Sequence, residues 1–290
     1  MTAHAGPIIA ERDGMRVVNC HGCGYAHLTE LPDQVALDKY YRSEFWATKG
    51  AGWLSRYEAE REWVEAKNGD WLSVIEQHTL GRTLLDIGAG YGFFVNQATA
   101  RGWQALGLEP SAEASEYART HGANIATETW QEHGPERRYD AMTAFWLLEH
   151  LPQPLEFLRW CRRNLYGSGT LTLAVPLEWS TEMMEANPLA SVTNWWVHST
   201  HTNYFTAATL SNLLGRAGFR VVDALTTYPM AQWIILGSDY TADAALGDHL
   251  HRSVRYIEVQ LTRDTRLSLA RQRAQQNEGR DLVVVAKVED

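Results

Sequence analysis

A chain of 290 residues with 45% hydrophobic content can bury a substantial core, which excludes disorder throughout. The formal net charge is -9, so the average surface lacks the positive field that nucleic acid or an anionic membrane would attract. No apolar run approaches the roughly 18 residues needed to cross a bilayer, and residues 1–14 lack the pattern of a signal peptide. We therefore expect a cytoplasmic protein without a nucleic-acid or membrane partner.

The first 81 residues contain two of the three cysteines, in the order Cys20-His-Gly-Cys23-Gly. This is half of a zinc knuckle, because two thiolates at this spacing can share one metal while backbone N–H groups support the sulfurs. A second cysteine pair is missing, so a complete site would need a histidine from the same segment: His4, His21 or His27. We expect a metal-free remnant rather than a zinc site, and we assign no metal ligand.

Residues 53–75 carry an apolar stripe at approximately helical spacing. Its members are Trp53, Tyr57, Trp63, Val64, Trp71 and Ile75. Gly69 and Asp70 predict a break in the helix. We interpret this segment as a cover that packs over the sheet described next.

Between residues 83 and 175, short apolar runs alternate with amphipathic stretches, which predicts βαβ units and a parallel sheet. We expect strands at 83–87, 105–108, near 125, 140–145 and 170–175, followed by strands at 219–222 and 282–288. Helices are expected at 93–101, after the N-cap residues Ser111 and Thr206, and at 155–165. Gly167 and Gly169 are expected to form the turn before the fifth strand.

A glycine-rich loop, Asp86-Ile-Gly-Ala-Gly-Tyr-Gly92, follows the first of these strands. Glycines between a strand and a helix let a ligand reach backbone N–H groups at the positive end of the helix, so such loops bind nucleotides. The dinucleotide fingerprint is G-x-G-x-x-G, whereas this loop reads G-x-G-x-G and Phe93 stands at the third dinucleotide position. The spacing therefore departs from that of NAD-binding loops.

Two carboxylates distinguish further between cofactors. Asp86 at the strand tip would repel a pyrophosphate but attract a ligand that carries an ammonium and a sulfonium. Glu109 ends the second strand, about 20 residues after the first glycine, where an acidic side chain accepts hydrogen bonds from ribose hydroxyls in either cofactor. The charges favour S-adenosylmethionine.

Three motifs resemble the class I S-adenosylmethionine-dependent methyltransferases. They are Leu84-Leu-Asp-Ile-Gly-Ala-Gly-Tyr-Gly92, Leu106-Gly-Leu-Glu-Pro110 and Tyr139-Asp-Ala-Met-Thr-Ala-Phe-Trp-Leu-Leu-Glu-His-Leu151. The resemblance covers residues 83–222. It implies an α/β fold, a three-layer Rossmann-like sandwich with a seven-stranded, mostly parallel sheet whose last strand is antiparallel, plus helical N-terminal and C-terminal additions.

By this resemblance, residues 82–290 form the methyltransferase domain, with inserts at 177–205 and 228–279, and residues 1–81 form a knuckle remnant with a helical cover. The aspartate and glycines of the motif line the methionine end of the cofactor, the acidic residue takes the ribose, and residues after the third and fourth strands flank the adenine. The implied residues are Asp86, Gly88, Ala89, Gly90, Tyr91, Glu109, Pro110, Trp130 and Phe145.

Some methyltransferases of sugars and related metabolites carry an N-terminal ribbon with two cysteine pairs, and the segment around Cys20 and Cys23 resembles its second half only. If that likeness holds, Tyr41, with Tyr40 and Trp46, belongs to a cover over the methionine end of the cofactor. The alternative for these aromatic residues is a staple between helices.

The acceptor must be held near the methyl group in a dry pocket, and an oxygen or protonated amine acceptor also needs a base, for which histidine fits neutral pH. Ligands of open α/β sheets bind outside the carboxyl edge. The candidates at that edge are His150, His198, His201 and Tyr204. The alternative to a catalytic base is that each histidine is a hydrogen-bonded structural residue. His198 and His201 could also bind a metal. No acidic or cysteine residue nearby in sequence offers an obvious third ligand, so we expect no metal at these histidines.

The predicted function is methyl transfer from S-adenosylmethionine, with S-adenosylhomocysteine as product, to oxygen, nitrogen or carbon of a small metabolite such as a sugar or natural-product scaffold. Two alternatives stay open. One is a non-catalytic S-adenosylmethionine-binding protein whose inserts dock a partner. The other is an NAD-dependent oxidoreductase, which Phe93 and Asp86 disfavour. Residues 177–205 and 244–276 could also form the face of a homodimer.

Overall fold

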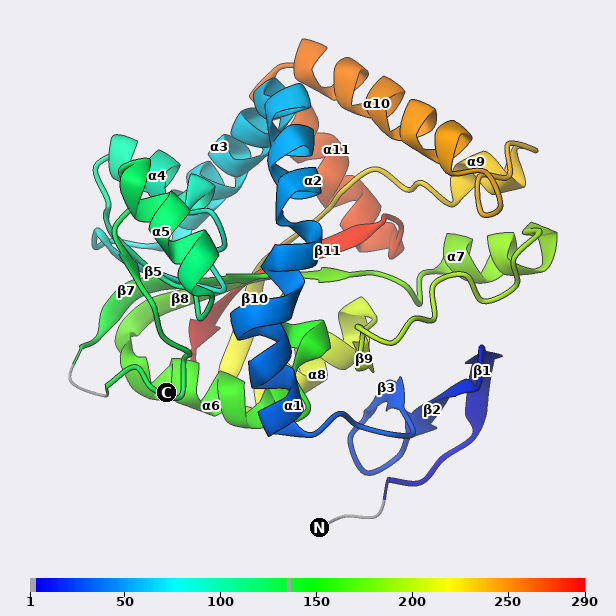
Figure 1. Cartoon of the computed structure of the whole chain (residues 1–290), viewed down its shortest axis with the longest axis horizontal. Coiled ribbons are helices and arrows are strands. Elements are labelled where there is room, and N and C mark those ends of the chain that lie inside the picture. The colour runs from blue at the N-terminus through cyan, green and yellow to red at the C-terminus, as the bar shows by residue number, and fades with distance from the viewer. Residues whose placement is uncertain (1–3, 135–136, 290) are drawn as a thin grey trace.

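The computed structural model describes residues 4–134 and 137–289 (Figure 1). The expected domains, residues 1–81 and 82–290, include residues 1–3 and 290, which lie outside the described residues. A seven-stranded sheet forms the centre. Its strands, in spatial order, are β10 (Phe219–Thr226), β11 (Asp281–Val288), β8 (Leu165–Pro176), β7 (Tyr139–Phe145), β4 (Thr83–Ile87), β5 (Gln104–Leu108) and β6 (Ile125–Ala126).

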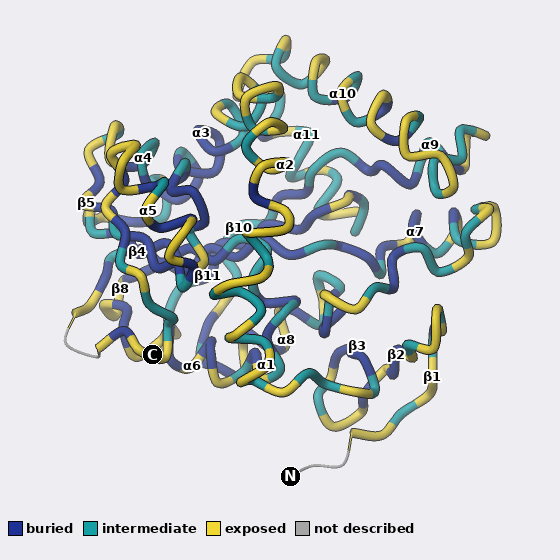
Figure 2. The backbone as a smooth tube through the Cα atoms, viewed as in Figure 1, coloured by how far each residue is buried: buried dark blue, intermediate teal, exposed yellow. Residues whose placement is uncertain are grey.

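The direction of the strands confirms the expected topology. β11 pairs antiparallel with both β10 and β8. The pairs from β8 to β6 are all parallel. The strands of this sheet are mostly buried (Figure 2), as their near-continuous apolar runs require in a sheet covered on both faces.

Helices cover both faces of the sheet and make three layers. Leu84 of β4 packs with α3 (Arg61–His78), α4 (Phe93–Ala100) and α5 (Ala112–Thr120), whereas its neighbour Leu85 packs with α6 (Pro154–Asn164) and α8 (Ala207–Arg216). α11 (Arg263–Gln276) lies on the α3 face against β11. The expected caps are confirmed: Ser111 accepts from the Ala114 backbone N–H, and Thr206 forms a capping box with Thr209.

The expected break at Gly69 and Asp70 is wrong. α3 runs unbroken through both residues, and the chain breaks instead at Glu60, between α2 (Phe45–Ala59) and α3. The Asp70 carboxylate is buried and receives two hydrogen bonds from Arg266, at 2.6 and 2.9 Å. The Gly69 carbonyl accepts from Arg101 at 2.8 Å. Tertiary contacts therefore override the local preference.

The expected turn at Gly167 and Gly169 is also wrong. Both residues lie inside β8, which begins directly after α6 at Leu165. The pairing of β8 with β7 shifts register at this point. A side chain on Gly169 would place its Cβ 2.9 Å from the Tyr166 carbonyl oxygen, so the glycine serves an irregularity in the strand.

A second, smaller sheet joins the N-terminal segment to the 177–205 insert. Its order is β1 (Ile8–Arg12), β2 (Met15–Cys20), β3 (Tyr25–Leu28) and β9 (Asn203–Tyr204), all antiparallel. Its core includes Val17 from β2 and Trp196 from the insert. The N-terminal segment and the insert thus share one core. The division into units at residues 81 and 82 stays a prediction.

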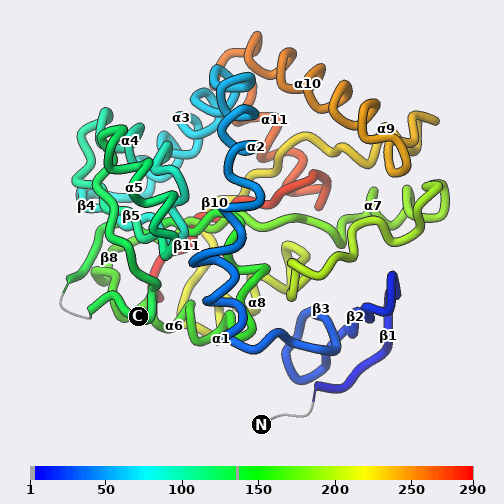
Figure 3. Tube along the Cα trace, viewed as in Figure 1, coloured from blue at the N-terminus to red at the C-terminus, as the bar shows by residue number. Residues whose placement is uncertain are grey.

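The remaining elements are helices that link or cover these sheets. Figure 3 follows the chain from the small sheet through α1 and α2 to α3. The remaining helices and helical turns are α1 (Gln34–Lys39), the π-helical turn η1 (Tyr40–Glu44), the 3-10 turns η2 (Leu148–His150) and η3 (Asn187–Leu189), α7 (Thr181–Ala186), α9 (Gln232–Ile235) and α10 (Ala244–Gln260). Across the described residues, no helix combines the length and apolar character that a membrane span needs.

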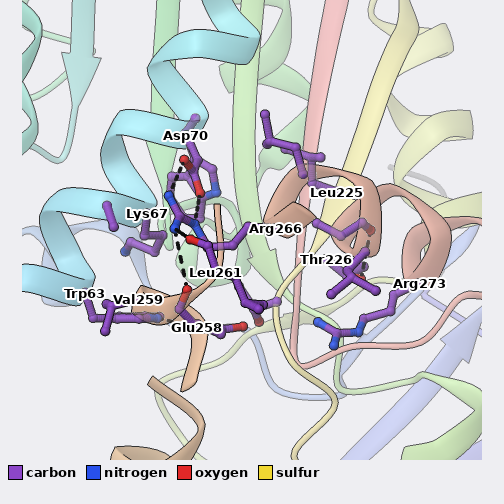
Figure 4. Close-up of a pocket in the computed structure, with 16 residues that line it drawn as sticks. Trp63, Lys67, Asp70, Leu225, Thr226, Glu258, Val259, Leu261, Arg266 and Arg273 are labelled. Carbon is purple, nitrogen blue, oxygen red and sulfur yellow. Dashed lines mark hydrogen bonds and ion pairs between the residues drawn. The ribbon is translucent and has the colours of Figure 1, made fainter. Parts of the chain in front are cut away.

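The Asp70–Arg266 pair ties α3 to α11 at the wall of a pocket between α3, β10 and the helices that follow (Figure 4). Arg263 reaches the same carboxylate at 3.5 Å, but its side chain is 54% exposed against 19% for Arg266. The two arginines therefore form a matched pair of probes.

Replacing Arg266 by alanine should lower the free energy of unfolding by about 3 kcal/mol, because it leaves a buried carboxylate with only an exposed partner. The Arg263→Ala control should cost less than about 1 kcal/mol. Urea unfolding of both variants measures the difference. Equal losses for the two would show that α3 does not depend on the buried pair.

Candidate functional site

The glycine loop between β4 and α4 has a backbone that only glycine adopts readily. Gly88, Gly90 and Gly92 have φ angles of 78°, 54° and 72°, in the left-handed region. A Cβ on Gly92 would lie 2.6 Å from the Ala123 side chain. The backbone N–H groups of Gly88 and Ala89 both donate to the Leu108 carbonyl at 2.9 Å. The loop is therefore folded tightly against the end of β5.

Two buried carboxylates flank this loop. Asp86, 4% exposed, accepts a hydrogen bond of 2.7 Å from Thr143, and burial raises its pKa to about 7 despite that bond. Glu109, also 4% exposed, accepts from the backbone N–H groups of Gly90 at 2.9 Å and Ser111 at 3.0 Å. Burial raises the pKa of Glu109 as well, against the effect of its hydrogen bonds. Within the described residues no arginine or lysine pairs with either carboxylate, so the site suits a cationic ligand.

The N-terminal helices cover the loop. The Trp46 indole N–H donates to Glu109 at 3.2 Å, and its ring lies 4.6 Å from that of Tyr91. A Cβ on Gly90 would lie 3.1 Å from Trp46. A Cβ on Gly50 of α2 would lie 2.3 Å from the Tyr91 hydroxyl, so this glycine permits the close approach. Trp46 thus contacts the carboxylate predicted to hold the ribose.

Trp130 and Phe145, the residues predicted to flank the adenine, lie on opposite faces of the sheet. Trp130 packs against Phe157 and Trp160 of α6. Phe145, the last residue of β7, packs 4.8 Å from the rings of both Trp71 and Phe94. The structure does not bring the two together, and their contact with adenine stays a prediction. Pro110 links Glu109 to the cap of α5.

The three histidines predicted at the carboxyl edge form one cluster. The ring centroids of His150 and His201 are 5.1 Å apart, and those of His198 and His201 are 3.9 Å apart. The Tyr41 ring lies 5.7 Å from His150 and 5.5 Å from Phe45, which in turn packs on Trp46. A continuous row of aromatic rings therefore joins the histidine cluster to the cover of the glycine loop.

Glu178 holds two of these histidines, and we assigned it no role from sequence. His201 Nδ1 donates to its carboxylate at 2.8 Å, and His198 Nε2 lies 3.3 Å from it. Burial would raise the pKa of Glu178, but the charge and hydrogen bonds of the histidines outweigh burial and lower it. Our premise that no acidic residue lies near His198 and His201 is therefore wrong. One signal for this role is present in the sequence: Glu178 is an acidic residue two positions after the end of β8.

Glu149 is the second carboxylate without a predicted role. It is 1% exposed, and neither of its oxygens has a hydrogen-bond partner among the described residues. Burial raises its pKa well above the ordinary value. Burial, followed by the effect of His201, lowers the pKa of His150 to about 4, so this imidazole is neutral at physiological pH. Glu149, His150 and His201 bring ligating atoms within 4.8 Å of one another.

Tyr204 differs from the histidines in its surroundings. It is 1% exposed in β9, packs 5.2 Å from Trp196, and directs its hydroxyl to the His198 carbonyl at 3.5 Å. Burial raises its pKa above the ordinary value. The side chain supports the loop that carries His198, and its contact with an acceptor stays a prediction.

A family model described as "Methyltransferase domain" matches residues 60–224, more than half of the chain. A ubiquinone biosynthesis O-methyltransferase of Serratia proteamaculans is 36% identical over 96 residues, 30% of this chain and 40% of the relative. The corresponding enzyme of Erwinia tasmaniensis is 30% identical over 108 residues, 34% of this chain and 44% of the relative. The matched segment thus spans less than half of these relatives.

Solved structures share the fold at low identity. Magnesium protoporphyrin IX methyltransferase from Synechocystis, with bound S-adenosylhomocysteine, has a TM-score of 0.55 at 12% identity and covers 89% of this chain and 100% of its own. A SAM-dependent methyltransferase from Archaeoglobus fulgidus has a TM-score of 0.54 at 18% identity, covering 81% and 99%. The chain belongs to the methyltransferase family matched above, within the class I S-adenosylmethionine-dependent methyltransferases.

Affinity for S-adenosylmethionine should rise about tenfold between about pH 5.5 and 7.5, because the raised pKa of Asp86 leaves its carboxyl neutral at the lower pH. Asp86→Asn should weaken binding and remove most of this slope. The matched control is Glu116→Gln, an exposed carboxylate on α5. Calorimetric titration across this range measures the slope, and an unchanged affinity and slope in Asp86→Asn would exclude Asp86 from the site.

Proposed function

We propose that the chain transfers the methyl group of S-adenosylmethionine to an oxygen atom of a small-molecule acceptor, with His201 as the base. The observation that carries this proposal is the hydrogen bond from His201 Nδ1 to Glu178 at 2.8 Å. A carboxylate on Nδ1 fixes the tautomer in which Nε2 can accept a proton. The O-methyltransferase names of the bacterial relatives support an oxygen acceptor over nitrogen or carbon.

The cofactor would be held by the glycine loop and its two carboxylates. Asp86 and Glu109 would complement its positive charge, and Gly88, Ala89, Gly90, Tyr91 and Pro110 would shape its cradle. When bound, S-adenosylmethionine supplies an electrophilic methyl group on a sulfonium that is already primed to leave. Tyr41 and Trp46 of the N-terminal helices would exclude water from this side, and Trp130 and Phe145 stay second candidates for the adenine.

The acceptor would bind beside η2, where His150, His201 and Glu149 converge. His201 takes the proton of the acceptor hydroxyl through Nε2 while Glu178 stabilises the imidazolium that forms. Neutral His150 donates from Nδ1 to the Thr200 carbonyl, which orients its ring toward His201. The unpartnered Glu149 carboxyl suits a hydrogen bond with a second hydroxyl of the acceptor. A polyhydroxylated metabolite, such as a sugar or phenolic scaffold, fits these groups.

A labelled methyl group tests the activity. We expect transfer from S-adenosylmethionine into the small-molecule fraction of a metabolite extract and none into its protein or RNA fractions. Failure of transfer in protein that binds the cofactor would favour the alternative of a non-catalytic S-adenosylmethionine-binding protein. The proposal of a small-molecule acceptor does not depend on whether the chain is a monomer or a homodimer.

His201→Ala should lower kcat by about 100-fold or more, because it removes the base and leaves the cofactor site intact. Glu178→Gln should lower kcat less and shift the pH–rate profile, since the imidazolium loses its counter-charge. The control is His121→Ala, an exposed histidine stacked on Tyr117. Wild-type kcat in His201→Ala, with cofactor affinity unchanged, would exclude this residue as the base.

A further inference from the structure

Four side chains with metal-binding atoms converge at one end of the small sheet, and none of them belongs to the site described above. Cys20 ends β2, Cys23 lies in the turn that follows, His27 stands in β3, and His4 comes from the segment before β1. One ligating atom from each lies within 4.8 Å of all the others. Both cysteines are free thiols rather than a disulfide.

Three of the six separations are close to the edges of a tetrahedral site, and the other three are at most 4.8 Å. With Zn–S near 2.3 Å and Zn–N near 2.0 Å, a tetrahedron has edges of about 3.5 Å between sulfur and nitrogen and about 3.3 Å between two nitrogens. Cys23 Sγ lies 3.4 Å from His4 Nδ1, and Cys20 Sγ lies 4.0 Å from the same atom. His4 Nδ1 lies 3.1 Å from His27 Nε2. One Zn²⁺ ion can therefore contact all four atoms with only small side-chain shifts.

Groups around the cluster orient its ligands. The Cys23 backbone N–H donates to Cys20 Sγ at 3.4 Å, which is the support that a thiolate needs in a knuckle. His27 Nδ1 donates to the Leu28 carbonyl at 2.7 Å, which leaves Nε2 to face the cluster. Gly24 has a φ of 77°, which allows the tight turn between the cysteine pair and β3.

We propose that His4, Cys20, Cys23 and His27 bind one structural Zn²⁺ ion. Two thiolates and two imidazoles form a closed tetrahedral set, which selects zinc and leaves no position for a substrate. The two histidines supply what the missing second cysteine pair would supply. This proposal departs from the expectation of a metal-free remnant, and the metal analysis below decides between the two.

The metal would also position the acceptor side of the proposed active site. His27 pairs with Asn203 of β9, and the Asn203 amide donates to the carbonyls of Leu148 and Leu151 on either side of His150. The adjacent Leu28 N–H donates to the Thr202 carbonyl at 2.8 Å. The zinc ligand in β3 is therefore linked by backbone pairing to the segment that carries His201.

Metal analysis of the full-length protein, purified without chelator, tests the proposal, and we expect about one zinc per chain. The probe for geometry is Co²⁺ exchanged into the same protein, which should show the visible bands of a tetrahedral site and a thiolate-to-cobalt band. The double variant Cys20→Ser, Cys23→Ser should lose the metal, and His21→Ala, an exposed neighbour, should keep it.

His4→Ala keeps the test decisive if the double variant fails to fold, because His4 is exposed and lies outside both sheets. It should fold, bind S-adenosylmethionine, and shift the cobalt spectrum toward a site with one water ligand. Folded wild-type protein without zinc or cobalt binding would overturn the proposal. So would full metal retention in a folded Cys20→Ser, Cys23→Ser variant, which would show that the ion binds at another group of side chains, such as Glu178, His198 and His201. These readouts do not depend on methyl transfer.

Discussion

Asp86 and Glu109 are buried at the carboxyl ends of two adjacent parallel strands, and no described arginine or lysine neutralises either. The apolar runs of β4 and β5 are buried on both faces of the sheet. The polar residues Asp86 and Glu109 stand at the carboxyl ends of these strands, next to the glycine loop. The cost of burying these carboxyl groups appears as raised pKa values rather than as ion pairs. A cationic ligand in the loop would relieve that cost, and this is the physical reason why we expect the loop to bind S-adenosylmethionine.

The N-terminal helices and the small sheet connect the proposed cofactor loop to the proposed acceptor region. Trp46 and Gly50 place α2 on the loop through Glu109 and Tyr91, and Tyr41 in the preceding turn reaches His150. β9 brings the 177–205 insert onto the N-terminal sheet, so the segment with the histidines is held from outside the large sheet. The additions to the common fold thus form one side of the proposed acceptor region.

Local patterns were enough to predict the seven strands of the large sheet, the caps at Ser111 and Thr206, and the charges around the loop, because each depends on residues close in sequence. The four strands of the small sheet were not predicted. The unbroken α3 could not be predicted, since the partner of Asp70 is Arg266, 196 positions later. Glu178 acquires its role only when the insert folds back and places His201 against it. The function of a lone carboxylate or histidine depends on such distant contacts, which hydrophobic periodicity does not encode.

We expect the two buried carboxylates to select a cationic nucleoside over a dinucleotide. Calorimetric titration of the wild-type chain with S-adenosylmethionine, S-adenosylhomocysteine and NAD tests this expectation most directly. We expect the first two ligands to bind at one site per chain and NAD not to bind. At low salt, the cationic ligand should have the more favourable electrostatic contribution. Binding of NAD together with none of S-adenosylhomocysteine would contradict it.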